Sequence, residues 1–217
     1  MSKAPTRNQT SDEILSDAEI RAISRRGTAR SCSKNTVVVA EGDRTDTLYI
    51  IVSGRVRVYV ADELGKEVTL GEQGAGEYFG EMVLDEGPRS ASVITLESCR
   101  FIVVPKADVL AFLAENPGFT VHLIKKLIRR GRTLTENVKS LALLDVYGRV
   151  ARMLLELAEE HDGVLTIERR PTQQDMASRV GASREMVSKI LTDLTTGGYL
   201  RVEGRSMIIA KSLPSRW

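Results

Sequence analysis

The residues best suited to hold a ligand lie in the run GEYFGEM and in the run GPRSA that follows it. Gly76 and Gly80 allow a backbone to approach a ligand closely and leave its N–H groups free for an anion. Glu81 offers an acceptor for hydroxyl groups. Arg89 offers a forked donor that suits a phosphate, and Ser90 adds another donor. Together these groups would hold a sugar phosphate; the alternative is an irregular surface loop with a Glu–Arg pair.

A second stretch, from Thr172 to Leu191, predicts two short helices joined by a tight turn. Thr172 is a good N-cap, and Asp175 three residues later makes a weak capping box. Gly181 should end the first helix because glycine takes the left-handed turn at little cost, and Ser183 can cap the second helix. The apolar stripe of the second helix would be Met186, Val187, Ile190, Leu191 and Leu194. This pattern is typical of a helix-turn-helix, whose second helix enters the DNA major groove.

The exposed face of that second helix would carry Ser183, Arg184, Glu185, Ser188 and Lys189. Arginine reads a guanine edge with two parallel donors, and a carboxylate can accept a hydrogen bond from cytosine N4. From Arg169 to the end of the chain, nine Lys and Arg residues stand against four Asp and Glu residues, an excess of +5. A local cationic excess suits a module that contacts DNA phosphates. The alternative is an ordinary helical hairpin with a solvated charged face.

Composition excludes several kinds of site. The chain has 217 residues, of which 42% are hydrophobic, so it can form a packed core, and its net charge of only +2 indicates no particular partner. Cys32 and Cys99 are far apart in the sequence, and His122 and His161 stand alone, so no metal site is expected. A disulfide is not expected either, because the predicted cytoplasmic setting is reducing. No signal peptide or membrane span is apparent, which predicts a cytoplasmic protein without a membrane partner.

From Thr36 to about Pro105, short β-branched runs alternate with turn residues. The predicted strands lie in TVVVA, LYIIV, RVRVYV, EVTL, SASVIT and RFIVV. Many short strands with closely spaced turns are typical of an all-β sandwich or roll. Lys106 to Asn116 then predicts a short helix that ends at Pro117.

A long helix is predicted from Phe119 to Leu144. Small or apolar residues repeat along it at steps of three and four, at Ile124, Leu127, Gly131, Leu134, Val138 and Leu141. This heptad seam predicts a partner helix, and we expect a homodimer because ordinary helix-turn-helix proteins pair to read two half-sites. Gly131 costs about 1 kcal/mol relative to alanine but would permit close approach of two helices. The alternative is a helix packed on its own β-domain.

After the long helix, Asp145 is a suitable N-cap for a new helix from Val146 to Glu160. Leu144 and Asp145 are therefore a candidate hinge. The predicted helix would end at His161, Asp162 and Gly163.

The C-terminal end of the chain predicts strands. Val164 to Glu168 is one candidate, and Tyr199–Val202 and Met207–Ile209 predict a hairpin that turns at Glu203-Gly204. A hairpin after a recognition helix is a wing. Arg205, at its tip, can contact the DNA backbone.

Gly80-Glu81 with Arg89-Ser90-Ala91 closely resembles the phosphate-binding cassette of cyclic-nucleotide-binding domains. The order of β-roll, long helix and winged helix-turn-helix resembles the cyclic-AMP receptor protein and oxygen-sensor superfamily of bacterial transcription regulators. The resemblance covers about Ser11 to Ala210. The runs LALLDVYGRVARMLLELA and GASREMVSKIL are most similar to the cyclic-AMP receptor branch.

The resemblance implies an α+β fold in three parts. Residues 11–117 would form a jelly-roll-like β-roll that binds a cyclic nucleotide, residues 118–144 a dimerisation helix, and residues 145–217 a winged helix-turn-helix domain. It implies a homodimeric transcription regulator that binds an inverted repeat in double-stranded DNA and works with RNA polymerase. The effector would be cyclic AMP.

Roles in the nucleotide site follow from the same resemblance. Gly80 would supply a backbone contact, and Glu81 would bind the ribose 2′-hydroxyl. Arg89 and Ser90 would bind the cyclic phosphate. The remaining residues of the predicted site are Met82, Ala91, Leu134 and Thr135.

Roles in DNA binding follow likewise. Arg184, Glu185 and Lys189 would read base edges. The full predicted set is Thr172, Gln173, Ser183, Arg184, Glu185, Ser188, Lys189 and Arg205. Lys189 stands where the family usually has arginine, and lysine lacks the forked donor, so base discrimination there would be looser.

One departure leaves the effector open. The cyclic-AMP receptor protein recognises adenine with a Thr-Ser pair on the dimer helix, and the matching residues here are Leu134 and Thr135. Leu134 cannot form that hydrogen bond, so cyclic di-GMP, another effector or ligand-independent binding stay as alternatives. A structural dimer without DNA binding is a further alternative. An enzyme would need a nucleophile and base, for which His122 and His161 have no obvious partner.

Overall fold

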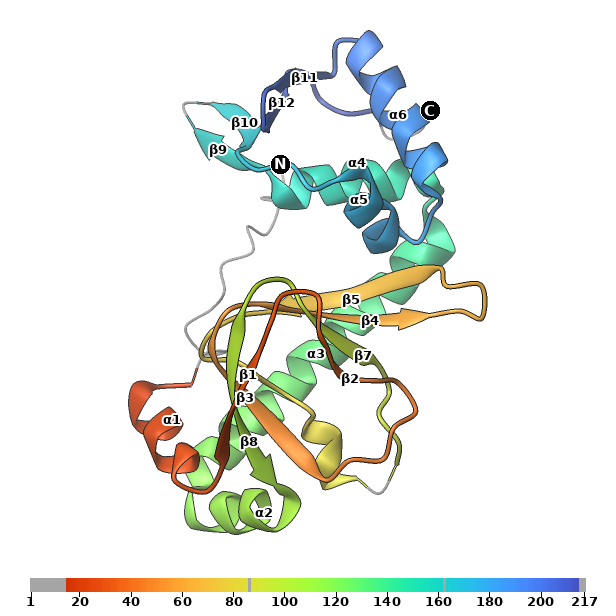
Figure 1. Cartoon of the computed structure of the whole chain (residues 1–217). Coiled ribbons are helices and arrows are strands. Elements are labelled where there is room, and N and C mark those ends of the chain that lie inside the picture. Colours follow the sequence, from red (N-terminus) through yellow and green to blue (C-terminus); the bar gives the residue numbers. More distant parts are fainter. Residues whose placement is uncertain (1–14, 86, 162, 215–217) are drawn as a thin grey trace. The chain divides into compact units, whose positions relative to one another are not determined.

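The computed structural model describes residues 15–85, 87–161 and 163–214 (Figure 1). The described part of the chain divides into two compact units, with the boundary between Gly131 and Arg132. The predicted start of the first domain, residue 11, lies outside the described residues. The three-part division into 11–117, 118–144 and 145–217 stays a prediction.

The N-terminal unit is a β-roll made of two antiparallel sheets. The first sheet has the order β1-β8-β3-β6, formed by β1 (Thr28–Cys32), β3 (Thr47–Ser53), β6 (Tyr78–Phe79) and β8 (Cys99–Pro105). The second has the order β2-β7-β4-β5, formed by β2 (Val37–Val39), β4 (Val56–Ala61), β5 (Glu67–Gln73) and β7 (Ser92–Thr95). Every predicted strand is present. The pattern missed β1, whose TARSC sequence lacks an apolar run, and the two-residue β6.

Strand β3 shows why the roll has two cores. Its alternate residues Tyr49 and Ile51 face the interior between the sheets, where the Tyr49 and Phe79 rings stack with their centroids 4.9 Å apart. Leu48 and Ile50 point to the other side, into a cluster with residues of the helices. Both faces of β3 are therefore buried, which explains its continuous apolar sequence.

Helices cover the outer side of the first sheet. They are α1 (Asp17–Ser24), α2 (Lys106–Glu115) and α3 (Pro117–Leu143), and a short 3-10 turn, η1 (Glu81–Leu84), follows β6. Helix α3 begins at Pro117, two residues earlier than predicted, because proline is well accepted in the first turn of a helix. Its side chains Phe119, Leu123 and Lys126 are buried.

The predicted seam lies on an exposed face of α3. The side chains of Ile124, Leu127, Leu134, Val138 and Leu141 are 43–65% exposed, and Gly131 is exposed as well. The alternative in which this stripe packs on the chain's own β-domain is therefore wrong. The contacts with the β-roll are made instead by Phe119 and Leu123.

The C-terminal unit surrounds a separate core. It contains α4 (Val146–Leu157), α5 (Gln173–Val180) and α6 (Arg184–Thr196), and a sheet of order β11-β12-β10-β9. The strands are β9 (Glu159–His161), β10 (Val164–Ile167), β11 (Leu200–Glu203) and β12 (Ser206–Ile209). The prediction that a helix continues to Glu160 was wrong. Helix α4 ends at Leu157, and β9 pairs with β10, so that Val164 lies opposite His161 around the left-handed Gly163.

Candidate effector and DNA-binding sites

Gly80 shapes the turn that leads into the predicted ligand site. It precedes η1 with φ +85°, a left-handed conformation that favours glycine. A Cβ atom at this position would lie 3.0 Å from Arg89 Nη1 and 3.0 Å from the Thr47 carbonyl oxygen. The glycine therefore permits the guanidinium to lie against the turn.

Arg89 is a buried cation held by uncharged oxygens. Its side chain is 4% exposed. Nε donates to Thr45 Oγ1 at 2.7 Å, Nη1 to the Gly80 carbonyl at 2.7 Å, and Nη2 to the Thr47 carbonyl at 2.6 Å. Burial lowers the pKa of Arg89, against the opposing effect of nearby acidic groups. Of the five N–H groups of a guanidinium, these bonds leave two for a ligand, and a buried cation gains most from an anion.

Glu81 presents an unsatisfied acceptor beside this cation. The residue is 8% exposed, and its Oε1 accepts a hydrogen bond from Arg130 Nη1 of α3. Its Oε2 is buried and has no hydrogen-bond partner among the described residues. Leaving such an atom unpaired costs roughly 1–3 kcal/mol, so the site is suited to a ligand hydroxyl that donates to it.

A second cation of α3 contacts the same segment. Lys126 Nζ donates to the Tyr78 carbonyl at 2.6 Å and lies 3.7 Å from the centroid of the Tyr78 ring. Burial, followed by the charge of Glu81, raises the pKa of Tyr78, so this phenol stays protonated. Sequence reasoning missed Lys126 and Arg130. The only signal was the basic run KKLIRRGR within the predicted long helix.

The other predicted nucleotide-site residues are divided between the two units. Met82 is partly buried in η1, Ala91 is buried, and Ser90 is exposed. Leu134 and Thr135 lie on an exposed stretch of α3 within the C-terminal unit. Their contact with a nucleotide base stays a prediction.

The helix-turn-helix has the predicted local structure. Thr172 caps α5 by accepting from the Asp175 backbone N–H, and the Asp175 carboxylate accepts from the Thr172 N–H in return. Gly181 ends the helix with φ +66°, and Ser183 caps α6 by accepting from the Met186 N–H at 3.2 Å. Thr172 and Ser183 thus position the two helices.

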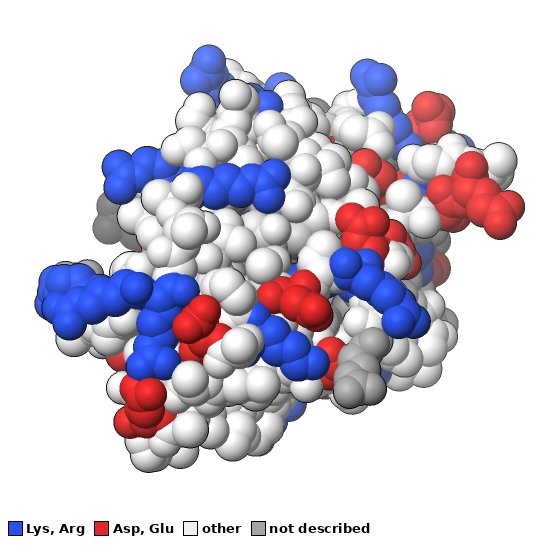
Figure 2. All heavy atoms as spheres, turned by 60° about the horizontal axis from the view of Figure 1, so that its bottom comes forward, with Lys and Arg blue, Asp and Glu red and all other residues white. Residues whose placement is uncertain are grey.

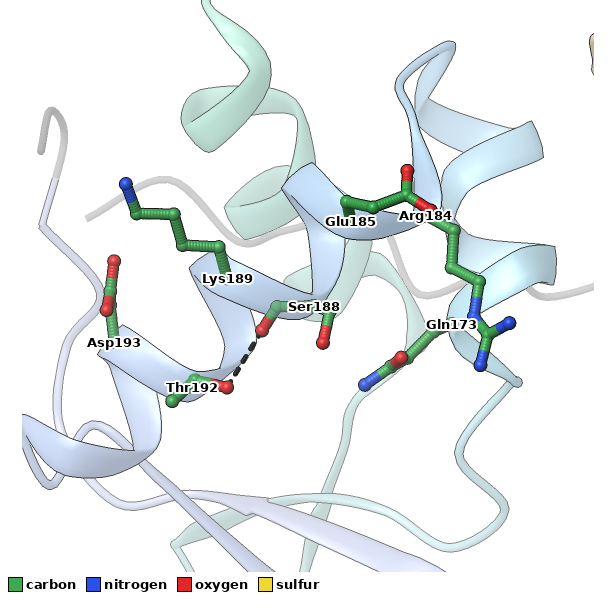
Figure 3. Close-up of a pocket in the computed structure, with 7 residues that line it drawn as sticks. All are labelled: Gln173, Arg184, Glu185, Ser188, Lys189, Thr192 and Asp193. Carbon is green, nitrogen blue, oxygen red and sulfur yellow. Dashed lines mark hydrogen bonds between the residues drawn. The ribbon is translucent and has the colours of Figure 1, made fainter.

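Most of the predicted reading residues line one hollow of about 490 Å³ on the exposed side of α6 (Figure 3). It is formed by Gln173, Arg184, Glu185, Ser188, Lys189, Thr192 and Asp193, of which Thr192 and Asp193 were not predicted. Hydrogen bonds from its own backbone N–H and from the Ser183 hydroxyl lower the pKa of Glu185, so this carboxylate is available as an acceptor. Met186 is 47% exposed, so its assignment to the apolar stripe was wrong.

Three arginines gather at the wing formed by β11 and β12. Arg169, Arg170, Gly204 and Arg205 line a hollow of about 270 Å³, and the Arg170 N–H donates to the Arg205 carbonyl at 3.0 Å. Such a cluster suits a phosphate. Sequence reasoning named Arg205 and counted Arg169 and Arg170 only within the basic excess.

The predicted hinge coincides with the end of α3. Asp145 caps α4 by accepting from the Gly148 N–H at 2.7 Å. Arg149 donates from Nη1 to the Leu144 carbonyl at 2.9 Å and from Nε to the Val180 carbonyl at 2.8 Å. Arg149, which sequence reasoning missed, thus joins the candidate hinge to the last turn of α5.

Charge elsewhere is mixed. On the face drawn in Figure 2, Lys and Arg side chains lie among Asp and Glu side chains, which agrees with the small net charge of the chain. Among the described residues, no group of three or more His, Cys, Asp or Glu side chains could hold a metal ion. The helices of the described part of the chain are too short or too polar to cross a membrane.

Comparison with known proteins assigns a domain family to each of the two parts of the chain. Residues 29–116 match the cyclic nucleotide-binding domain family, and residues 148–214 match the Crp-like helix-turn-helix domain family. A "CRP-like cAMP-activated global transcriptional regulator" of Mycobacterium tuberculosis is 37% identical over 180 residues, which cover 81% of this chain and 80% of that one. The chain belongs to the Crp-like family of transcription regulators. The predicted superfamily and fold class are thereby confirmed.

Further relatives extend the comparison. The "cAMP-activated global transcriptional regulator CRP" of Escherichia coli O6:H1 is 34% identical over 182 residues, covering 82% of this chain and 86% of that one. A solved structure described as the c-di-GMP responsive global regulator CLP of Xanthomonas campestris is 26% identical, with a TM-score of 0.79, and covers 90% of this chain and 100% of that one. This Crp-like regulator is therefore a DNA-binding protein with a cyclic-nucleotide-binding domain, and it is not an enzyme.

Proposed function

We propose that this regulator is a homodimer whose affinity for an inverted repeat in DNA is set by cyclic AMP bound between Gly80 and Ala91. The observation that carries the proposal is a buried cation beside a buried, unpaired carboxylate oxygen. Arg89 has two N–H groups left for a ligand, and Glu81 Oε2 has no partner among the described residues. A ribose cyclic phosphate supplies an anion and a hydroxyl on one small, rigid ring system.

The effector is cyclic AMP in this proposal because the curated relatives named above are cAMP-activated regulators. The cyclic phosphate would accept from the two remaining N–H groups of Arg89, and the ribose hydroxyl would donate to Glu81 Oε2. Ser90 is exposed, so it would reach the phosphate from the solvent side. The contacts with Arg89 and Glu81 would thus give hydrogen-bond partners to charged, buried groups of the free protein.

The link to DNA binding would begin at α3. Arg130 holds Glu81 Oε1 while the ligand engages Oε2, and Lys126 holds the Tyr78 carbonyl just before the turn. A ligand that binds one arrangement of these contacts more tightly shifts the population toward it. Leu144 and Asp145 would then act as the hinge that re-aims α6.

Two chains would pair through the exposed seam of α3. Apolar side chains that are 43–65% exposed at heptad spacing are costly on a single helix and suit a second copy of the same helix. The two-fold symmetry of such a dimer requires an inverted repeat, with half-site centres about 34–36 Å apart. RNA polymerase as a partner and a location in the cytoplasm belong to the same proposal, because a regulator that acts at bacterial promoters meets RNA polymerase in the cytoplasm.

Cyclic di-GMP is the second candidate effector. The c-di-GMP responsive regulator of Xanthomonas campestris shares this fold over 100% of its chain. Leu134 also lacks the hydrogen-bonding group with which the family recognises adenine. Cyclic di-GMP would be preferred over cyclic AMP if the contact between the base and α3 supplies most of the binding energy.

Isothermal titration calorimetry of the full chain with cyclic AMP, cyclic GMP and cyclic di-GMP tests the proposal. Tight binding of cyclic AMP, lost in an Arg89→Leu variant and weakened in a Glu81→Ala variant, is the expected result. Preference for cyclic di-GMP would select the second candidate. Absence of binding by all three nucleotides would refute control by a cyclic nucleotide at this site.

A further inference from the structure

The two cysteines of the chain lie directly opposite each other in the first sheet. Cys32 is the last residue of β1 and Cys99 is the first residue of β8, and the antiparallel register pairs the two positions. Both are free thiols. The two cysteines are far apart in the sequence, and the pairing of β1 with β8 brings them together.

The register places the two side chains within reach of a covalent bond. Opposite residues of antiparallel strands have Cα atoms roughly 4.5–5.5 Å apart and side chains on the same face. A disulfide needs a Cα separation of about 4.4–6.8 Å. Cys32 packs against the core cluster that contains Cys99, which agrees with a shared face.

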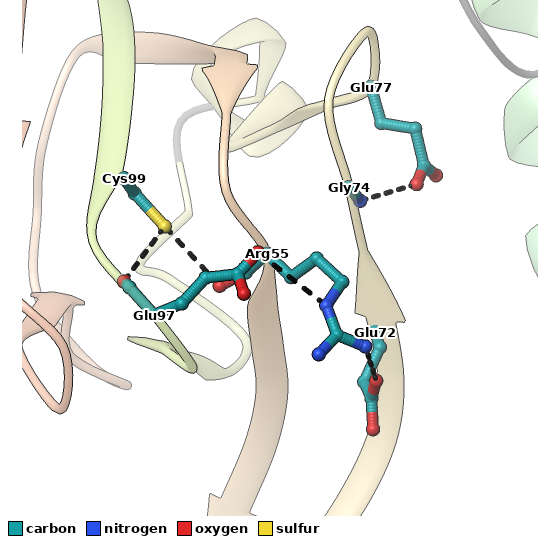
Figure 4. Close-up of polar contacts among 6 residues, drawn as sticks. All are labelled: Arg55, Glu72, Gly74, Glu77, Glu97 and Cys99. Carbon is teal, nitrogen blue, oxygen red and sulfur yellow. Dashed lines mark hydrogen bonds and ion pairs between the residues drawn. The ribbon is translucent and has the colours of Figure 1, made fainter. Parts of the chain in front are cut away.

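Cys99 is held only by weak contacts that a new bond could replace. Its Sγ lies 3.3 Å from the Arg55 carbonyl and 3.3 Å from the Glu97 carbonyl (Figure 4). A thiol is a weak donor with a single hydrogen, so it cannot donate fully to both oxygens. Both cysteines also lie at strand ends. A small rotation of the backbone there disturbs only the last residue pair of the β1–β8 ladder.

We propose that Cys32 and Cys99 form a redox-sensitive dithiol, which low-molecular-weight disulfides such as oxidised glutathione convert to an intramolecular disulfide. The Cys32 thiolate attacks one sulfur of the oxidant, giving a mixed disulfide and releasing one thiolate. Cys99, after losing its proton, attacks Cys32 Sγ and releases the second thiolate. Two protein thiols and one small disulfide thus become one protein disulfide and two small thiols.

Exposure decides the order of the two steps. Cys32 is partly exposed and can meet an oxidant, whereas Cys99 is 2% exposed and can only meet Cys32. Burial raises the pKa of the Cys99 thiol, and the neighbouring Cys32 adds to this effect. Cys99 is therefore the slower, resolving thiol.

The bond would fasten β1 to β8 far from the effector site. In the pairing of β3 with β8, Ser53 lies opposite Arg100 and Thr47 lies opposite Pro105, so Cys99 and the Thr47 carbonyl that holds Arg89 are at opposite ends of the strands. Joining positions 32 and 99 also closes a long loop of chain. The oxidised β-roll should unfold at a higher temperature than the reduced one.

The test is oxidation of the native full-length protein with oxidised glutathione, followed by alkylation with iodoacetamide under denaturing conditions. The expected product is a monomeric chain on a non-reducing gel with a mass lower by two hydrogens. It should take up no alkyl group until a reductant is added, and proteolysis should yield a peptide that links residues 32 and 99.

Two variants serve as controls. Cys32→Ser should give at most a glutathione adduct on Cys99. The double variant Ser31→Cys with Cys32→Ser keeps two thiols but moves one to the opposite face of β1, because side chains alternate along a strand. It should form no internal disulfide. Complete alkylation of the oxidised wild type, or disulfides only between chains, would overturn the proposal, and so would equal internal disulfide formation in the double variant.

Discussion

Replacing Arg89 by leucine should abolish effector binding while the β-roll stays folded. The guanidinium has two N–H groups available for a phosphate after its three bonds to protein oxygens. Two hydrogen bonds from a charged donor are worth roughly 1.5–3 kcal/mol each. Their loss corresponds to a decrease in affinity of roughly 10²- to 10⁴-fold, since about 1.4 kcal/mol is a factor of ten.

The cost of Arg89→Leu to folding should be much smaller. The Gly80 carbonyl still accepts from the Val83 N–H at 3.0 Å, and Thr45 is exposed, so its hydroxyl can turn to water. The Thr47 carbonyl also loses the Arg89 donor, and Pro105 opposite it has no N–H with which to replace that donor. One unpaired acceptor costs about 1–3 kcal/mol, and removal of a buried charge offsets part of that.

Calorimetric titration with cyclic AMP, together with a thermal melt, separates the two effects. The Arg89→Leu variant should melt at most about 10 °C below the wild type. Arg89→Lys is the matched control. It keeps the positive charge but loses the forked donor of the guanidinium, so its affinity for cyclic AMP should lie between those of the wild type and the Arg89→Leu variant. Wild-type affinity for cyclic AMP in a folded Arg89→Leu variant would refute the assignment of Arg89 as the phosphate ligand.

Four further predictions concern the turn, the dimer, the reading face of α6 and the wing. Gly80→Ala should weaken cyclic AMP binding by roughly tenfold in calorimetry, because its φ of +85° disfavours a side chain and a Cβ atom would lie 3.0 Å from two neighbouring groups; unchanged affinity would contradict this. Lysine at both Leu127 and Leu141 should give a monomer in light scattering, and a persisting dimer would place the interface elsewhere. Arg184→Ala should cost about 1–3 kcal/mol on the matched DNA site and relax the choice of one base pair in a selection from random sequences. Arg205→Ala should instead weaken binding to all DNA sequences alike, and it should lower the slope of log affinity against log salt concentration by about 1. An altered consensus sequence in that variant would contradict a role limited to phosphate contact.

Features that depend on neighbouring residues could be predicted from the sequence. The N-caps Thr172, Ser183 and Asp145 act on backbone groups three residues away, and Gly181 carries its conformational preference within itself. The order of strands and helices followed from the same kind of local signal. The end of α4 was misplaced, because a turn with Gly163 can close a hairpin as well as end a helix. Strand β1 was missed because its TARSC sequence lacks an apolar run.

Features that depend on distant pairing could not be predicted. Nothing near Lys126 or Arg130 in the sequence indicates that these cations contact Tyr78 and Glu81. The pairing of Cys32 with Cys99 likewise depends on the register of β1 and β8. Resemblance to a family supplied the roles of the cassette residues, but it did not supply these contacts.

The most direct test of the central claim is the DNA affinity of the full chain with and without cyclic AMP at one fixed salt concentration. Fluorescence anisotropy should use an inverted-repeat site selected from random sequences, with a scrambled duplex as control. We predict that cyclic AMP raises the affinity for the selected site about tenfold or more, which is typical of the coupling between an effector site and a second binding site. The Arg89→Leu variant should lose this increase. Equal affinity in the presence and absence of cyclic AMP, cyclic GMP and cyclic di-GMP would contradict the account, because a ligand without differential affinity shifts no equilibrium.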